Sequence, residues 1–130
     1  MTIANDLLTR FMLALCVYRE ARGESMRGKE LVAQVILNRV RDTRWPDTVS
    51  GVVTQRWQFS AFNAGDPNAL LFPHENDPAW DACVNAADLI LQLPKPITTA
   101  NHYHVIGILP KWADAENVVT REGHHIFYTL

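Results

Sequence analysis

The first helix of the chain is predicted to end within the stretch Tyr18-Arg19-Glu20-Ala21-Arg22-Gly23-Glu24-Ser25. Apolar residues recur at helical spacing before it, from residue 3 to residue 20. Gly23 favours the left-handed turn that stops a helix. Glu20 then lies in the last helical turn and Glu24 just beyond it. Because residues four apart share a helix face, the two carboxylates are expected to lie near one another.

Two neighbouring carboxylates at a helix end indicate acid–base chemistry. The negative end of the helix dipole and the nearby like charge both disfavour ionisation, and burial against aromatic side chains adds to this effect. A glutamate that stays protonated near neutral pH is suited to act as a general acid. Glutamates at this spacing are also common as solvated surface charges, so the stretch by itself leaves both interpretations open.

Three further segments are predicted to be helical. Apolar residues recur at helical spacing from about residue 28 to residue 41. Asp47 or Thr48 is placed to cap a short helix that runs through Gln55. Asp77-Pro78 then begins a helix that continues to about residue 93, with proline at its favoured first position.

The remaining segments are predicted to be loops and short extended pieces. Residues 63–77 contain glycine, prolines and several Asn and Asp, which indicates a long binding loop or lid. The closing run, residues 123–128, is rich in β-branched and aromatic residues and fits a short strand. Together with the helices, these segments indicate a mainly α (α+β) fold in one compact domain.

Composition limits the classes of function. The 130 residues are 48% hydrophobic and include four Trp, five Phe and three Tyr, enough for a core and an aromatic-lined cleft. The net charge of −2 gives no indication of nucleic acid as a partner. Residues 1–60 carry nine Lys or Arg against six Asp or Glu, so the first half is mildly basic and suited to approach an anionic polymer.

Cysteines and terminal segments bear on the chemistry and the location. Cys16 and Cys83 form neither a CxxC pair nor a zinc pattern, and both are predicted to be buried free thiols. The N-terminus lacks the features of a secretory signal, and no apolar stretch approaches the length of a membrane span. We therefore expect a chain that is made in the cytoplasm without a signal peptide and has no stable membrane association.

Polar side chains gather among aromatic residues in several segments, a composition that suits a sugar site. Sugar rings present apolar C–H faces for stacking and hydroxyl groups for hydrogen bonding. The alternative is a core in which Trp, Tyr and His tips find partners. The candidate substrate-binding residues are Gln58, Phe59, Ser60, Asn101, Tyr103, His104, Trp112, His125 and Tyr128.

A metal site is a second chemical reading of the histidines. His102-Tyr103-His104 and His124-His125 would have to join Glu20 or Glu24 around zinc, which takes histidine and carboxylate ligands. The sequence contains no HExxH motif. We therefore expect neither a metal nor another cofactor, and a zinc amidase or peptidase remains an alternative.

A series of blocks in fixed order resembles the cell-wall hydrolase family typified by the spore-cortex-lytic enzyme SleB. The resemblance runs through nearly the whole chain, and the shared order makes it far more specific than any single block. The blocks are Glu20 to Glu24 followed by Gly28, Asn38-Arg39-Val40, Gln58-Phe59-Ser60, Tyr103-His104, Pro110-Lys111-Trp112-Ala113, and Gly123 to Tyr128.

The resemblance implies a lysozyme-like fold in which residues 1–130 form a single catalytic domain. It implies cleavage of peptidoglycan between N-acetylmuramic acid and N-acetylglucosamine, with Glu20 as the catalytic acid. Lytic transglycosylase chemistry is favoured over hydrolysis by a muramidase. Glu24 is then either a second catalytic carboxylate or a residue that shapes the electrostatics of Glu20.

We expect the protein to depart from typical family members in having neither a secretion signal nor a separate wall-binding domain. Such minimal forms resemble phage-type endolysins, which are made in the host cytoplasm and reach the wall at lysis. We expect a monomer whose partner is the peptidoglycan glycan strand. The rival from another class is a non-catalytic glycan-binding module, in which both glutamates are surface charges.

Overall fold

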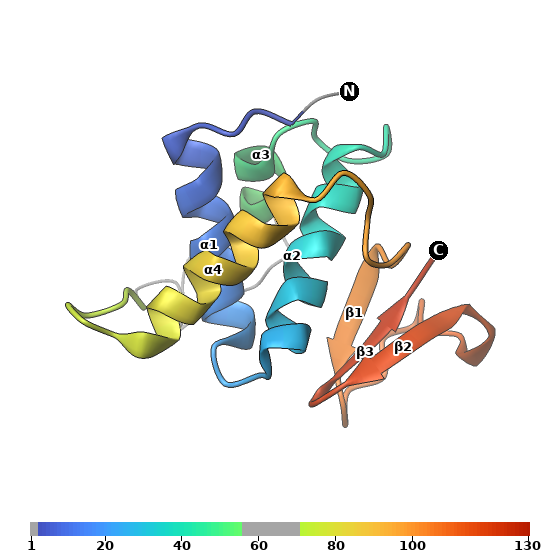
Figure 1. Ribbon diagram of the computed structural model, residues 1–130. Coiled ribbons are helices and arrows are strands. Elements are labelled where there is room, and N and C mark those ends of the chain that lie inside the picture. Colours follow the sequence, from blue (N-terminus) through green and yellow to red (C-terminus); the bar gives the residue numbers. More distant parts are fainter. Residues whose placement is uncertain (1–2, 56–70) are drawn as a thin grey trace.

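The computed structural model describes residues 3–55 and 71–130 and consists of a helical layer beside a small sheet (Figure 1). The predicted site residues Gln58, Phe59 and Ser60 lie outside the described residues. The helices are α1 (Leu7–Ala21), α2 (Met26–Val40), α3 (Val49–Thr54) and α4 (Pro78–Gln92). The later elements are β1 (His102–Val105), the 3₁₀ helix η3 (Ala115–Asn117), β2 (Val118–Glu122) and β3 (His125–Tyr128).

Each of the four α-helices begins at a polar side chain that accepts a hydrogen bond from the first turn. Asp6 accepts from the Thr9 amide and Ser25 from the Gly28 amide, so α1 and α2 begin at Leu7 and Met26, not at the predicted residues 3 and 28. Of the two caps considered for α3, Thr48 is the one observed. Asp77 caps α4 as predicted.

The turn between α1 and α2 falls where the sequence predicted it, but its mechanism differs. Helix α1 ends at Ala21, and Arg22 keeps a right-handed backbone with φ of −59°. The turn is closed by the Glu24 amide, which donates to the Ala21 carbonyl at 2.9 Å, and by Lys29, which donates to the Glu24 carbonyl. Gly23 is not among the described residues with positive φ, so the predicted left-handed glycine turn is wrong.

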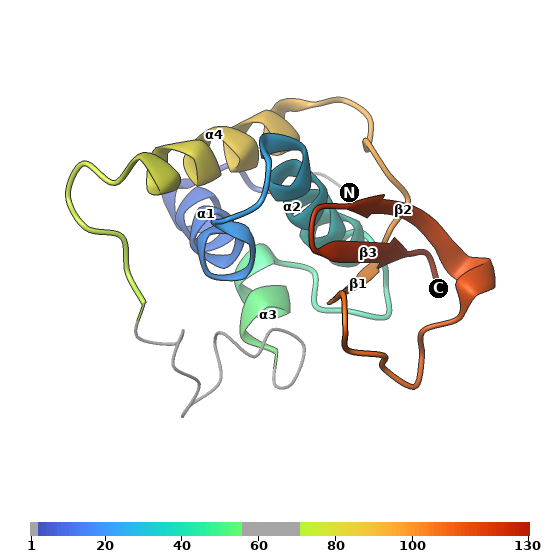
Figure 2. The same ribbon diagram turned by 90° about the horizontal axis from the view of Figure 1, so that it is seen from below.

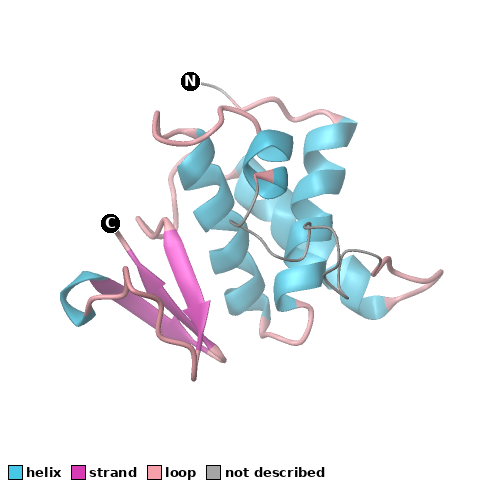
Figure 3. Ribbon diagram, turned by 180° about the vertical axis from the view of Figure 1, so that it is seen from behind, coloured by secondary structure: helices cyan, strands magenta, loops and turns pink. Residues whose placement is uncertain are grey.

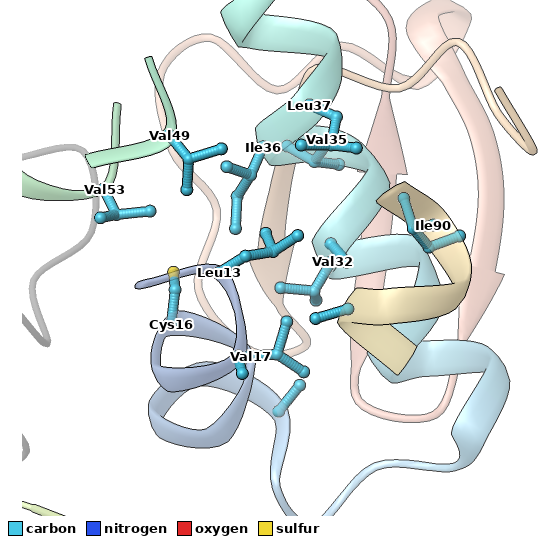
Figure 4. Close-up of a cluster of buried hydrophobic side chains, with 14 of the residues drawn as sticks. Leu13, Cys16, Val17, Val32, Val35, Ile36, Leu37, Val49, Val53 and Ile90 are labelled. Atoms are coloured by element: carbon cyan, nitrogen blue, oxygen red, sulfur yellow. The ribbon is translucent and has the colours of Figure 1, made fainter. Parts of the chain in front are cut away.

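The hydrophobic core lies between the four helices (Figure 4). Helices α1, α2 and α3 contribute side chains that are almost completely inaccessible to solvent, and α4 closes one side with Ile90. Cys16 and Cys83 are both buried and free, which confirms the prediction for the two thiols. The labelled core residues are Leu13, Cys16, Val17, Val32, Val35, Ile36, Leu37, Val49, Val53 and Ile90.

The three strands form an antiparallel sheet in the order β1-β3-β2, which lies to one side of the helices (Figures 2 and 3). The sequence predicted only the last strand. Strand β2 contains Thr120, Arg121 and Glu122 and lacks an apolar alternation, and β1 contains two histidines, so neither has the usual strand composition. Within the described residues, no helix combines the length and apolar character that crossing a membrane requires.

Polar side chains of α2 attach the start of the sheet to the helical layer. Asn38 donates to the carbonyls of Thr98 and Ala100 at 2.9 and 2.8 Å. Arg39, which is buried, donates from Nε to the Asn101 carbonyl at 2.7 Å. Arg39 therefore fixes the backbone from which β1 starts.

Candidate active site

A pocket of about 310 Å³ opens where the C-terminal end of α1 meets the sheet. The first side of the pocket is the α1–α2 turn, and the second is formed by the end of β1 and the turn between β2 and β3. The pocket therefore joins segments from the two ends of the sequence. Its described lining residues are Arg19, Glu20, Ala21, Arg22, Gly23, Glu24, Val105, His124 and His125.

Glu20 lies in the last turn of α1 and contacts the sheet through Tyr103. The Tyr103 hydroxyl donates to Glu20 Oε1 at 2.8 Å. Burial and the negative charge of Glu20 raise the pKa of Tyr103 well above its usual value, so its phenol remains a hydrogen-bond donor at physiological pH. The carboxyl group of Glu20 is thus oriented by a neutral donor.

Glu24 lies on the same pocket but is held by the β2–β3 turn. Its Oε1 accepts from the His124 amide at 2.7 Å, and its Oε2 accepts from His124 Nδ1 at 2.8 Å. The side chain is only 8% exposed. Burial acts to raise the pKa of Glu24, but the two hydrogen bonds from His124 and the nearby His125 outweigh it, and the pKa is lowered. This direction is opposite to the one expected for a carboxylate at a helix end.

Gly123 lets the turn approach Glu24 this closely. It has φ of +56°, a conformation that side chains disfavour. A Cβ atom at this position would lie 2.6 Å from Glu24 Oε1, inside van der Waals contact. Gly123 belongs to one of the sequence blocks that resemble the family, but nothing in the sequence indicated that the Gly123 turn contacts Glu24.

His125 and Tyr103 lie together on the face of the sheet that meets α1. Their ring centroids are 5.0 Å apart, and His125 Nδ1 lies 3.3 Å from Glu24 Oε1 without a hydrogen bond of good geometry. Burial is the largest effect on His125 and lowers its pKa, which favours the neutral imidazole. The structure thus brings two of the predicted substrate-binding residues to the two glutamates.

The other described candidates do not line this pocket. His104, Trp112 and Tyr128 pack against one another on the opposite face of the sheet, with ring centroids 5.1 to 5.8 Å apart. Asn101 is buried and donates from Nδ2 to the Leu130 carbonyl, while its Oδ1 accepts from the Leu130 amide. These contacts give all four residues a packing role, and their assignment to substrate binding stays a prediction.

The histidines do not gather with other ligands into a metal site in the part of the chain that is described. Within residues 3–55 and 71–130, no group of three or more His, Cys, Asp or Glu side chains is placed to hold a metal ion. His102 and His104 lie on the face of the sheet away from Glu20 and Glu24, because residues two apart on a strand share a face and Tyr103 points the other way.

The fold and the site define a class: a mainly helical, lysozyme-like domain with a carboxylate-lined pocket beside a small sheet. The predicted fold class is thereby confirmed. A family model described as Cell Wall Hydrolase matches residues 23–128. The chain belongs to this cell wall hydrolase family, as the order of its sequence blocks predicted.

Curated relatives share extensive sequence with the chain. It is 46% identical over 117 residues to the spore cortex-lytic enzyme of Halalkalibacterium halodurans, an alignment that covers 89% of the chain and 33% of that relative. It is 33% identical over 124 residues to the spore cortex-lytic enzyme of Bacillus cereus, covering 89% of the chain and 42% of the relative. The chain thus spans less than half of the length of these relatives.

Two solved structures are similar over nearly the whole chain. The catalytic domain of the Bacillus cereus SleB protein superposes with a TM-score of 0.76 at 31% identity, covering 98% of this chain and 95% of that one. The catalytic domain of the germination-specific lytic transglycosylase SleB from Bacillus anthracis gives a TM-score of 0.78 at 31% identity, covering 98% and 100%. Glu20 lies before residue 23, where the match to the family model begins. The two structural alignments, by contrast, cover 98% of the chain.

Proposed function

We propose that this chain cleaves peptidoglycan glycan strands between N-acetylmuramic acid and N-acetylglucosamine, with Glu20 as general acid and then base. The observation that carries the proposal is the contrast between the pocket's two glutamates. Tyr103, a neutral phenol, donates to one oxygen of Glu20, whereas both oxygens of Glu24 accept hydrogen bonds from His124. The names of the spore cortex-lytic relatives support the substrate class.

In the first step, Glu20 donates its proton to the oxygen of the glycosidic bond as the bond to C1 breaks. The muramic acid ring passes through an oxocarbenium-like transition state. Tyr103 donates to Oε1 before and after the transfer, and so keeps the carboxyl group oriented while its charge changes. General acid catalysis of this kind contributes about 10²–10⁴-fold.

The second step distinguishes a transglycosylase from a hydrolase. Retaining and inverting hydrolases use a second carboxylate as nucleophile or base. Glu24 is a poor candidate, because its hydrogen bonds hold it against the hairpin and lower its basicity. The C6 hydroxyl of the muramic acid instead attacks C1, and the Glu20 carboxylate accepts the hydroxyl proton. The product is a 1,6-anhydro sugar, and no water is consumed.

Mass analysis of muropeptides released from purified peptidoglycan tests this proposal. A lytic transglycosylase releases anhydro-muropeptides, each lighter by one water than the reducing products of a muramidase. Reducing products alone would assign the second step to water and reopen the role of Glu24. A non-catalytic binding module would release neither product, and a zinc amidase would release amino groups in a reaction that a chelator inhibits.

We also propose that residues 1–130 are sufficient for this activity. The chain covers 95% and 100% of two SleB catalytic domains whose structures are solved. The purified 130-residue chain is therefore expected to solubilise isolated cell walls, and to elute as a monomer in size-exclusion chromatography with light scattering. Activity that appears only after another protein is added would contradict this sufficiency.

A further inference from the structure

Arg22 is a cation at the pocket that the proposed reaction does not use. It lies between the two glutamates in sequence, lines the pocket and is exposed to solvent. One nitrogen, Nη1, donates to the carbonyls of Tyr18 and Arg19 at 3.4 and 3.3 Å. The guanidinium group lies 5.7 Å from the centroid of the Tyr18 ring. These contacts hold the cation at the end of α1.

The remaining donors of Arg22 have no described partner. Within residues 3–55 and 71–130, no ion pair joins Arg22 to a carboxylate, and both of its hydrogen bonds come from Nη1. Its neighbour Arg19 is different, because Arg19 is buried, donates from Nε to the Leu71 carbonyl and stacks over Phe72. Arg19 therefore joins two segments of the fold, whereas Arg22 is an exposed residue of the pocket lining.

We propose that Arg22 binds a carboxylate group of the substrate and so determines which wall material is bound. The inference rests on the proposed function, since peptidoglycan carries carboxylates on its peptide stems and on muramic acid residues without a stem. Arginine is suited to this task because its planar fork pairs with a carboxylate through two charge-assisted hydrogen bonds. It also offsets the negative potential of Glu20 and Glu24 toward an anionic polymer.

The alternative is that Arg22 only caps α1. A cation near a helix C-terminus stabilises the last carbonyls and the helix dipole. The two roles differ in their dependence on the substrate. Loss of a helix cap would lower thermal stability and affect activity on every substrate equally, whereas loss of a carboxylate-binding residue matters only when the substrate carries the negative charge.

The test compares native peptidoglycan with the same material after its carboxylates are amidated by carbodiimide and methylamine. This treatment removes charge and leaves the glycan intact. Arg22→Gln is expected to lower kcat/KM on native walls roughly tenfold, mainly through KM, because a hydrogen bond to a charged group is worth about that factor. On amidated walls, Arg22→Gln and the wild type should be equally active. Arg27→Gln removes another exposed charge, on α2, that does not line the pocket, and should match the wild type on both.

Other outcomes overturn the proposal. An equal loss on native and amidated walls would assign Arg22 to the helix end, and an equal loss in Arg27→Gln would assign the effect to bulk charge. Glycan strands from which the peptide stems have been removed identify the carboxylate that Arg22 binds. If Arg22→Gln still lowers kcat/KM on these strands, the carboxylate is the lactyl group of muramic acid. If Arg22→Gln no longer lowers kcat/KM, the carboxylate belongs to the peptide stem. Wall-pelleting of Glu20→Gln with and without Arg22→Gln tests the inference separately from cleavage. Equal binding of the two variants to native walls contradicts the inference even if the enzyme cleaves.

Discussion

The two faces of the three-stranded sheet carry similar aromatic and histidine side chains but meet different partners. On the face toward the helices, Tyr103 donates to Glu20, and His125 lies beside Glu24. On the opposite face, a 2.6 Å hydrogen bond joins His104 to Tyr128. Trp112 and His104 pack around the Tyr128 ring, so these three residues are one another's partners.

The difference teaches that residue type alone does not identify a site residue in this protein. Tyr103 and His104 are adjacent in sequence, yet they point to opposite faces because side chains alternate along a strand. What distinguishes them is the element that covers each face. The end of α1 brings the carboxyl group of Glu20 to Tyr103, whereas Trp112 packs against His104.

The largest expected effect tests whether the helix-side face is catalytic at all. Glu20→Gln conserves shape but removes the ionisable proton, so cleavage should fall by about 10²–10⁴-fold while the fold is retained. Muropeptide release measures the rate, and circular dichroism with a thermal melt checks the fold. A folded variant that keeps more than about a tenth of the wild-type rate would mean that another residue is the acid.

The two tyrosines allow a matched test of the two faces. Tyr103→Phe removes the hydroxyl that orients Glu20 and should lower kcat roughly tenfold, as expected for a hydrogen bond to a charged group. Tyr128→Phe removes the bond to His104 and should cost about 1 kcal/mol of stability with little change in kcat. If Tyr128→Phe reduced kcat as strongly as Tyr103→Phe at unchanged stability, the opposite face would also contact the substrate.

Glu24→Gln is expected to lower the rate less than Glu20→Gln. Removing a nearby negative charge lowers the pKa of the remaining acid, so the upper limb of the pH–rate profile should move to lower pH. Two observations together would show a two-carboxylate hydrolase: a Glu24→Gln variant that is folded but inactive, and a wild-type enzyme that yields reducing-end products.

Glu24 also makes a prediction for stability against pH. Its pKa is lower in the folded protein than the ordinary value of 4.5, so its stabilising effect is present above that value. The effect is lost as the pH falls through the lower folded pKa, because Glu24 is then protonated in the folded state and no longer accepts from His124 as a carboxylate. Acid denaturation of the wild type should therefore steepen below about pH 4.5, and this component should be absent from Glu24→Gln.

A last test concerns the turn that carries His124 to Glu24 and reads out stability instead of rate. Gly123→Ala should destabilise the protein by about 1–3 kcal/mol, since positive φ is strained for alanine and the new Cβ meets Glu24. Gly107→Ala is the control, because Gly107 also has positive φ but a Cβ there meets no atom within 4 Å. Chemical denaturation should show the larger loss for Gly123→Ala, and equal losses would mean that contact with Glu24 is unimportant.

Local pattern was sufficient for much of the helical part of this protein. The four helices, the end of α1 near Gly23 and the nearness of Glu20 to the α1–α2 turn follow from periodicity, caps and breakers, which act over a few residues. The order of short sequence blocks was sufficient for the family. Local pattern did not give the geometry of the α1–α2 turn, because the amide of Glu24 closes it without a left-handed glycine.

Only the tertiary structure decided which residues share the site. Tyr103 reaches Glu20 across 83 residues, and His124 reaches Glu24 across 100. These contacts depend on strand register, on which face of the sheet meets α1, and on the bonds by which Asn38 and Arg39 hold the start of β1. Register and facing are set by long-range packing, so the sequence by itself indicated two similar carboxylates, and folding gave them different partners.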